Sequence, residues 1–226
     1  MKPKMTFNLL TVIGKVKPQD VNAVRELHNN TAGHPEGVAA AKHLGDLSHM
    51  TYMPVGVDQK FDGQLLFLDI WNNLEGMNQF FSDEQVQGGA NMMFETREAV
   101  VWNPLDNFLN FAFPAPTGNN ERVVGMIRGF VKTLDEAVEI HNAGIAKNVL
   151  ISRSLGHLSH QFFVRLAASS APEALEVLGL DVWMNEKGMM EYYMGKDYAG
   201  INMNTMFNGK PTSSIWKNPG GSWVEW

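Results

Sequence analysis

The sequence predicts an α+β fold of two tandem ferredoxin-like βαββαβ repeats, whose antiparallel sheets are expected to pack into a pseudo-two-fold α+β barrel. The first observation is an internal repeat, because residues 44–49 read LGDLSH and residues 155–160 read LGHLSH. The second is a pair of matching strand ends, LDIW at 68–71 and LDVW at 180–183. The two echoes occur in the same order with nearly equal offsets (160 − 49 = 111 and 183 − 71 = 112), so each repeat is about one small domain.

The elements of the first repeat follow from its apolar periodicity and its turn residues. Residues 7–16 are rich in Leu, Val and Ile and precede Asp20, which predicts a strand followed by a helix start. Gly33 and Pro35 interrupt the helical pattern and predict a break in the first helix. The remaining expected elements are strands at 46–55 and 64–71, a helix at 72–94 and a short strand at 99–102. The second repeat gives the same order between 122 and 216, with its second helix beginning near Asn185.

The strand at 64–71 explains why the two repeats are expected to pair. Phe67 and Trp71 alternate with Leu66, Leu68 and Ile70, so both faces of this strand are apolar. Helices cover one face of a ferredoxin-like sheet, and a second sheet must cover the other. We therefore expect a first repeat at 1–104, a connecting arm at 105–120 and a second repeat with a C-terminal arm at 121–226. The chain is expected to be an internal pseudo-dimer, and a second copy of it is a candidate partner.

Each repeat ends in an aromatic segment. Phe108, Phe111 and Phe113 precede the Pro-rich end of the connecting arm, and Trp223 and Trp226 close the chain. Two interpretations are open: each arm reaches over the opposite repeat, or each coats its own.

The composition excludes several functions. The formal charge of −6 comes from 24 acidic and 18 basic residues that are scattered along the chain, so no basic surface is predicted and nucleic acid is not expected as a partner. The absence of cysteine removes disulfides and thiolate sites. The N-terminal apolar run is too short for a secretory signal or a membrane span, so we expect a cytoplasmic protein that does not contact membranes.

A strand that ends in Trp, then a polar turn and a helix that starts with apolar residues, occurs at 68–83 (LDIWNNLEGMNQFFSD) and again from 180 to 193. This segment resembles the antibiotic biosynthesis monooxygenase group of the dimeric α+β barrel superfamily. The resemblance implies a cavity for a hydrophobic small molecule, with members that include cofactor-free oxygenases of polyaromatic phenols, haem-degrading monooxygenases and isomerases. The haem-degrading members are expected to carry a His on the second helix. Residues 83–91 and the segment around Tyr198 lack one, so no haem and no other cofactor is expected.

Asp69 and Trp71 share one face of their strand by the two-residue period, as do Asp181 and Trp183. A carboxylate among Trp, Phe and Met would have a raised pKa and could act as a general base. The alternative is that each Asp caps a turn at the strand end.

His49 and His160 lie on the strands that form hairpins with the Asp-Trp strands, so His-Asp contacts across each hairpin are expected. Such a contact would fix one imidazole tautomer and leave the other nitrogen for a substrate proton. The alternative is a structural role for both histidines, because duplication of the repeat would copy a structural histidine as faithfully as a catalytic one.

His28 and His141, each followed by Asn, are expected late in the first helix of their repeats, on the face toward the same cavity. His28, His49 and Asp69 would supply two imidazoles and one carboxylate to a metal ion, but the sequence lacks closely spaced ligand pairs and we expect no metal. The other histidines, His34, His43 and His157, are expected on the surface.

Together these patterns predict a small-molecule enzyme that resembles cofactor-independent monooxygenases or isomerases and acts on a hydrophobic or aromatic substrate in a sheet-helix cavity. The alternative is a non-enzymatic ligand-binding or stress-related protein of the same fold. The second helices are rich in Met and aromatic residues, which suit either a core or an adaptable pocket. The halves differ at Asp46 against His157 and at Phe80-Phe81 against Tyr192-Tyr193. The catalytic candidates are His49, Asp69, His160 and Asp181, and the substrate-binding candidates are Trp71, Trp183, His28, His141, Phe80 and Tyr192.

Overall fold

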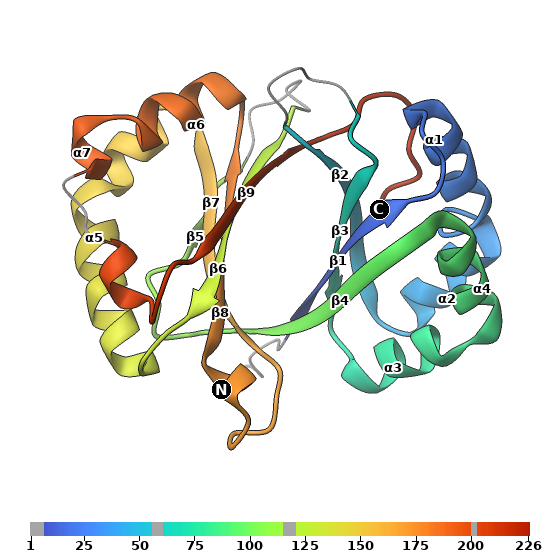
Figure 1. The fold of residues 1–226 in the computed structure, drawn as a ribbon, viewed down its shortest axis with the longest axis horizontal. Coiled ribbons are helices and arrows are strands. Elements are labelled where there is room, and N and C mark those ends of the chain that lie inside the picture. The colour runs from blue at the N-terminus through green and yellow to red at the C-terminus, as the bar shows by residue number, and fades with distance from the viewer. Residues whose placement is uncertain (1–6, 56–60, 115–120, 200–202) are drawn as a thin grey trace. The chain divides into compact units, whose positions relative to one another are not determined.

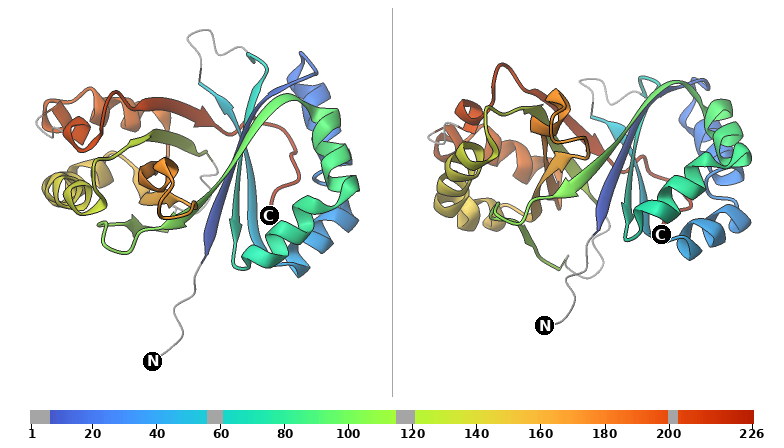
Figure 2. Two further views of the ribbon diagram at one scale, coloured as in Figure 1. Left: turned by 60° about the horizontal axis from the view of Figure 1, so that its bottom comes forward. Right: turned by 90° about the horizontal axis from the view of Figure 1, so that it is seen from below.

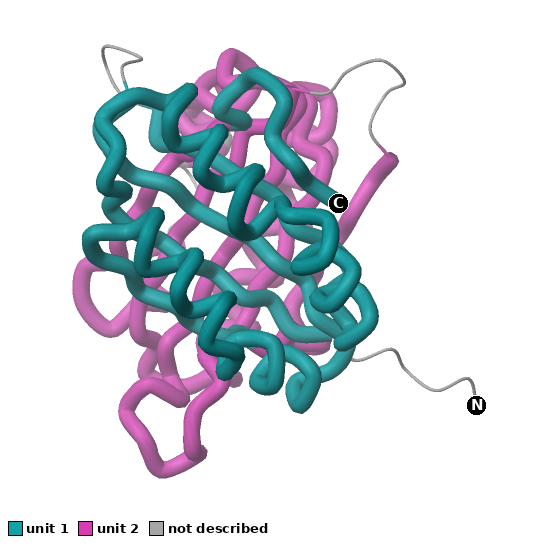
Figure 3. The backbone as a smooth tube through the Cα atoms, turned by 90° about the vertical axis from the view of Figure 1, so that its right-hand side faces the viewer, with its two compact units in different colours: residues 1–102, 218–226 teal, residues 103–217 magenta. Residues whose placement is uncertain are grey.

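The computed structural model of the chain describes residues 7–55, 61–114, 121–199 and 203–226 (Figure 1). It divides into two compact units (Figure 3). The first comprises residues 1–102 and 218–226, and the second comprises residues 103–217. None of the helices in the described segments is long and apolar enough to cross a membrane.

The first unit is a four-stranded antiparallel sheet in the order β4-β1-β3-β2. Its helices all lie on one face of that sheet (Figures 1 and 2). The elements are β1 (Asn8–Val16), α1 (Val21–Asn30), α2 (Pro35–His43), β2 (Asp46–Pro54), β3 (Gln64–Trp71), α3 (Leu74–Ser82), α4 (Glu84–Met93) and β4 (Phe94–Pro104).

The second unit repeats this topology, with its sheet ordered β9-β6-β8-β7-β5. The short strand β5 is an addition at the edge of β7. The elements are β5 (Phe111–Ala112), β6 (Val123–Phe130), α5 (Leu134–Ser154), β7 (His157–Arg165), η1 (Pro172–Leu175), β8 (Glu176–Trp183), α6 (Glu186–Tyr193), α7 (Lys196–Ala199), η2 (Met203–Met206) and β9 (Thr212–Lys217). The predicted α+β class and the ferredoxin-like order of both repeats are confirmed.

The helix expected over 72–94 is two helices. Asp83 has extended backbone angles, and its carboxylate accepts hydrogen bonds from the backbone N–H of Gln85 (2.8 Å) and Val86 (3.2 Å). It therefore ends α3 and caps the start of α4. The strand that follows begins at Phe94, five residues earlier than expected (99 − 94 = 5).

Strand register places the candidate side chains. His49 on β2 lies directly opposite Asp69 on β3, and His160 on β7 lies directly opposite Asp181 on β8. Opposite residues of an antiparallel pair project from the same face, so each His and Asp meet on one side of their sheet. In both hairpins the register shifts near the start of β2 or β7, between Asp46 and Ser48 and between His157 and Ser159.

Candidate functional site

Four side chains form a linear hydrogen-bonded chain in the first unit. Asn29 Oδ1 lies 3.0 Å from His28 Nδ1, His28 Nε2 lies 3.0 Å from His49 Nε2, and His49 Nδ1 lies 2.5 Å from Asp69 Oδ1. The two imidazole planes differ by only 12° while their centroids are 5.3 Å apart, so the rings meet edge to edge with their nitrogens facing each other. His28, His49 and Asp69 are all buried.

The second unit contains the same chain of residue types. His141 Nδ1 lies 2.9 Å from Asn142 Oδ1, the Nε2 atoms of His141 and His160 are 2.6 Å apart, and His160 Nδ1 lies 2.5 Å from Asp181 Oδ1. The imidazole planes differ by 9°. Both units therefore contain a hydrogen-bonded chain of an Asn, two His and an Asp, which we call the relay.

A peptide segment closes the outer end of each relay. In the first unit Asn29 Nδ2 donates to Ser222 O (2.8 Å), and Asn29 Oδ1 accepts from Val224 N (2.9 Å). Trp223 packs beside His28, and Trp226 stacks on His49 and exchanges backbone hydrogen bonds with it.

In the second unit Asn142 makes the equivalent bonds to Asn107 O (2.9 Å) and from Leu109 N (2.8 Å). Phe108 packs against His141, and Phe111 lies opposite His160 in the β5–β7 pair. A spacing of aromatic residues in the sequence, outside the repeat motifs used to predict the site, indicates that the two closing segments correspond. Aromatic residues stand four and seven positions after Pro104 (108 and 111) and likewise after Pro219 (223 and 226).

These contacts determine where the protons of the first relay lie. The backbone groups of Ser222 and Val224 fix the Asn29 amide, so its Oδ1 is an acceptor and His28 Nδ1 must donate to it. Burial and the nearby His49 lower the pKa of His28 to about 4, so His28 is neutral at pH 7 and its Nε2 accepts a hydrogen bond from His49 Nε2–H. Burial opposes a charge on His49, but Asp69 more than offsets this and raises its pKa. Since His28 Nε2 and Asp69 Oδ1 both accept hydrogen bonds, His49 donates from both of its ring nitrogens, which is the imidazolium form.

Histidine ring ¹⁵N spectra at pH 7 should show these proton positions directly. We expect His28 as the neutral Nδ1–H tautomer and His49 with both nitrogens protonated. Asn29→Leu removes the acceptor that holds His28 Nδ1–H, so the His28 tautomer should change in that variant. His43, which is exposed, should give the same signals in both proteins and serves as an internal reference. A neutral His49 in the wild type would contradict these proton positions.

One expectation about this site is wrong. The second ring nitrogen of His49 was expected to face a substrate, but it is bonded to His28. Both nitrogens of His49 are used inside the relay, so its imidazole does not present a lone pair to a ligand.

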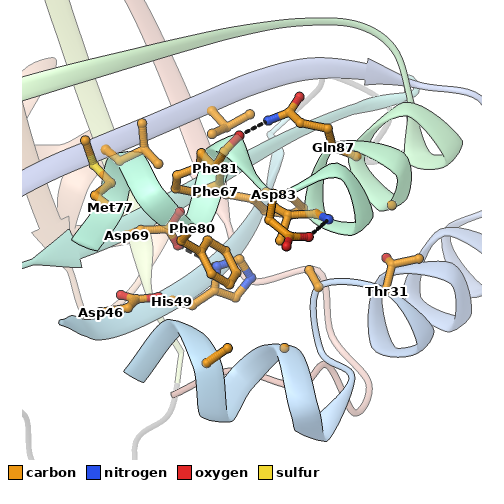
Figure 4. A pocket seen from close by; sticks show the side chains of 18 of the residues that line it. Thr31, Asp46, His49, Phe67, Asp69, Met77, Phe80, Phe81, Asp83 and Gln87 are labelled. Carbon is orange, nitrogen blue, oxygen red and sulfur yellow. Dashed lines mark hydrogen bonds and ion pairs between the residues drawn. The ribbon is translucent and has the colours of Figure 1, made fainter. Parts of the chain in front are cut away.

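The first unit contains a cavity of about 890 Å³ between its sheet and its helices. His49, Asp69, Trp71 and Phe80 from the sequence prediction line it, whereas His28 contacts His49 from outside the lining. Figure 4 shows Asp46 and His49 from β2 and Asp69 from β3 with the α3 side chains that border the same cavity. The apolar part of the wall includes Leu10, Val12, Phe67, Met77, Phe81 and Trp226.

Asp46 is a titratable group of this cavity that the sequence did not mark as catalytic. It is buried at the start of β2, and its Oδ1 accepts from Ser48 N at 3.2 Å. Burial, reinforced by the charge of Asp69, raises its pKa to about 7. The sequence signalled this position only as a difference between the repeats, Asp46 against His157. A carboxyl that titrates near neutrality beside an apolar cavity can take up or release a substrate proton.

The second unit arranges the same positions differently. Tyr193, which replaces Phe81, donates a hydrogen bond from its hydroxyl to Asp181 Oδ2. Tyr192 and Trp183 are buried in a cluster with Met189, against which Tyr193 packs. The carboxylate that corresponds to Asp69 is therefore covered by a tyrosine hydroxyl.

His157 was expected on the surface, but it is buried. Its ring stacks on Trp183, with centroids 4.1 Å apart and planes 4° apart, and its Nε2 lies 3.2 Å from Asp181 Oδ1. The prediction failed because His157 has no histidine counterpart in the first repeat, although its position is equivalent to that of the buried Asp46. His34 and His43 are exposed, as expected.

Comparisons with known proteins identify the fold. No family model matches the sequence, and no curated protein is similar to it. Among solved structures, an anthrone oxidase-like protein superposes with a TM-score of 0.67 at 12% identity, over 98% of this chain and 94% of that chain.

Candidate monooxygenases from Lactobacillus acidophilus NCFM and Fusobacterium nucleatum both superpose with a TM-score of 0.60, at 9% and 11% identity. The first comparison covers 94% of both chains, and the second covers 96% of both chains. At these identities the comparisons establish a shared fold and no more.

Proposed function

We propose that the first unit is the catalytic part of a small-molecule enzyme that resembles cofactor-independent monooxygenases and acts on a hydrophobic, aromatic substrate with an acidic C–H or O–H group. The observation that carries this proposal is the buried Asp46 carboxyl, with a pKa raised to about 7, in the wall of the apolar cavity. Its position beside Trp71, Phe80 and the His49–Asp69 pair supports proton abstraction from a molecule that the cavity takes out of water.

In this mechanism Asp46 is the general base. It removes a proton from the bound substrate and leaves an electron-rich carbanion or phenolate that reacts with molecular oxygen. The relay keeps His49 positively charged between His28 and Asp69, so the buried site holds one cation beside two carboxyl groups. Asp46 becomes neutral when it takes up the substrate proton, so the negative charge moves to the substrate and the total charge of the site does not change. Trp71 and Phe80 pack against the ring system of the substrate.

Anthrone is a suitable test substrate because an anthrone oxidase-like protein shares the fold. Its CH2 group has an acidic C–H bond, and its oxidation to anthraquinone consumes one O2 and releases one water without an external reductant. We expect the protein to accelerate O2 uptake and quinone formation over the buffer rate. The value of kcat/KM should rise with pH through an apparent pKa near 7, because Asp46 must be ionised to act as the base.

Asp46→Asn should lower kcat/KM by about 100-fold or more and remove the ionisation near pH 7. Glu36→Gln, which also removes one carboxylate from the cavity lining but at an exposed position, should change the rate less than about twofold. Equal rates for Asp46→Asn and the wild type would overturn the assignment of the base.

A non-enzymatic ligand-binding protein is the second candidate, favoured by the engagement of both His49 nitrogens inside the relay. In that case anthrone would quench the fluorescence of the cavity tryptophans without being oxidised. The same titration and O2 measurement therefore separate the two functions.

A further inference from the structure

Three donor groups that the proposed function does not use converge in the second unit. His157 Nε2 lies 3.2 Å and His160 Nδ1 lies 2.5 Å from Asp181 Oδ1, and the donor atoms of the three residues all lie within 4.8 Å of one another. The side chains of His157 and His160 are only 3% and 5% exposed. Two imidazoles and a carboxylate are a donor set for a transition-metal ion.

His157 has an unsatisfied requirement that such an ion would meet. Neither of its ring nitrogens makes a hydrogen bond within the described residues, although both are buried. Its Nε2 is close to Asp181 Oδ1 but is not aligned with it as a hydrogen-bond donor or acceptor. Two ligands of one ion have this relation, because each points at the ion, and tetrahedral zinc holds its nitrogen and oxygen ligands about 3.3 Å apart.

His160 is already oriented as a metal ligand. Leu109 N and Asn107 O fix the Asn142 amide, so His141 Nδ1 donates to Asn142 Oδ1 and the neutral His141 accepts at its Nε2 from His160 Nε2–H. The other ring nitrogen of His160, Nδ1, faces Asp181. Ligand histidines in metal sites typically donate their other ring N–H to such an outer partner. Between His160 Nδ1 and Asp181 the contact requires one cation, a proton or a metal ion.

We propose that the second unit binds one divalent transition-metal ion of the zinc class through His157 Nε2, His160 Nδ1 and the Asp181 carboxylate. The ion replaces the proton between His160 and Asp181, which is released to solvent, and the carboxylate turns to open the 2.5 Å contact. Tyr193 donates to the other carboxylate oxygen and orients it. In the first unit Asp46 stands where the second has His157, so the two-histidine donor set belongs to the second unit.

The test is a calorimetric titration of Zn²⁺ into full-length protein dialysed against a chelator, at pH 7.5 in two buffers of different ionisation enthalpy. We expect one ion per chain and release of about one proton per ion. With Co²⁺ as the probe, the visible spectrum should show the intense bands of a site with four or five ligands. The absence of stoichiometric binding in the wild type would overturn the proposal.

His157→Phe retains a ring that can stack on Trp183 but removes a ligand atom, and it should weaken Zn²⁺ binding by about 100-fold. His43→Phe, at an exposed histidine, should bind Zn²⁺ as the wild type does. Equal affinity of His157→Phe and the wild type would show an adventitious surface site. If His157→Phe does not fold, ring ¹⁵N spectra of the wild type decide: Zn²⁺ must shift His157 Nε2 and His160 Nδ1, and unchanged signals reject the site.

Discussion

Gly76→Ala should lower the free energy of unfolding of the first unit by about 3 kcal/mol, because an added methyl group has no space there. A Cβ at this position would lie 1.9 Å from the carbonyl oxygen of Leu44, which is backbone and cannot turn away. Gly76 lies in the first turn of α3, so this contact allows α3 to pack directly on the end of α2, next to the start of β2 and Asp46. Urea unfolding followed by tryptophan fluorescence measures the loss.

The chain supplies a matched control and an internal duplicate. Gly88 is in α4, and no heavy atom lies within 4 Å of the place that an added Cβ would take, so Gly88→Ala should stabilise the protein by about 0.5–1 kcal/mol through helix propensity. Gly188 repeats the Gly76 contact, with a Cβ that would lie 1.8 Å from Leu155 O. Gly76→Ala and Gly88→Ala should therefore differ in sign. Equal effects would mean that the close contact is not a constraint.

The repeat made the fold and part of the site predictable from the sequence. The paired LGxLSH and LDxW segments define a hairpin, and hairpin register alone places His49 opposite Asp69 and His160 opposite Asp181. These contacts depend on neighbouring strands and on the two-residue period, which sequence patterns carry well. For the same reason Trp71 could be placed on the face of Asp69.

The rest of the site depends on distances that no local pattern encodes. The contact between His28 and His49 requires a particular rotation of α1 over its sheet, and the hydrogen bonds of Asn29 come from a segment 193 and 195 positions away. The tautomers follow only when these partners are known. In the sequence, Asp46 and His157 are marked only as a position at which the two repeats differ. Both side chains are buried by tertiary packing, and this burial makes them chemically important.

Asp46→Asn should stabilise the protein at pH 8 and leave it nearly unchanged at pH 4. The folded-state pKa of Asp46 is raised to about 7 from 3.8, so the folded state holds a proton that the unfolded chain gives up between these values. Wild-type stability attributable to this group is therefore complete below about pH 4 and is lost as the pH rises through 7. The asparagine has no charge to bury, and its amide oxygen can still accept from Ser48 N.

The shift of about three pKa units sets a ceiling of about 4 kcal/mol for the gain at pH 8, and relaxation around the ionised carboxylate leads us to expect about 2 kcal/mol. The measurement is the unfolding free energy of the wild type and of Asp46→Asn at pH 4 and pH 8. The pKa of His28 is lowered, and because both proteins contain His28, its contribution to the pH dependence of stability cancels in their difference. Glu36→Gln, at an exposed carboxylate, should show no such pH dependence. A gain for Asp46→Asn that is equal at both pH values would contradict the buried ionisation.

The stability measurement also bears on the function, because it is independent of any substrate. A buried carboxyl beside Asp69 that costs stability at neutral pH is expected where the ionised form is needed, since a purely structural position is easily filled by a neutral residue. Asp46→Asn should therefore gain stability and lose the oxidation activity together. If the variant gains stability but keeps its rate, the buried ionisation of Asp46 is supported and its role as the general base is refuted. The two claims can therefore fail separately.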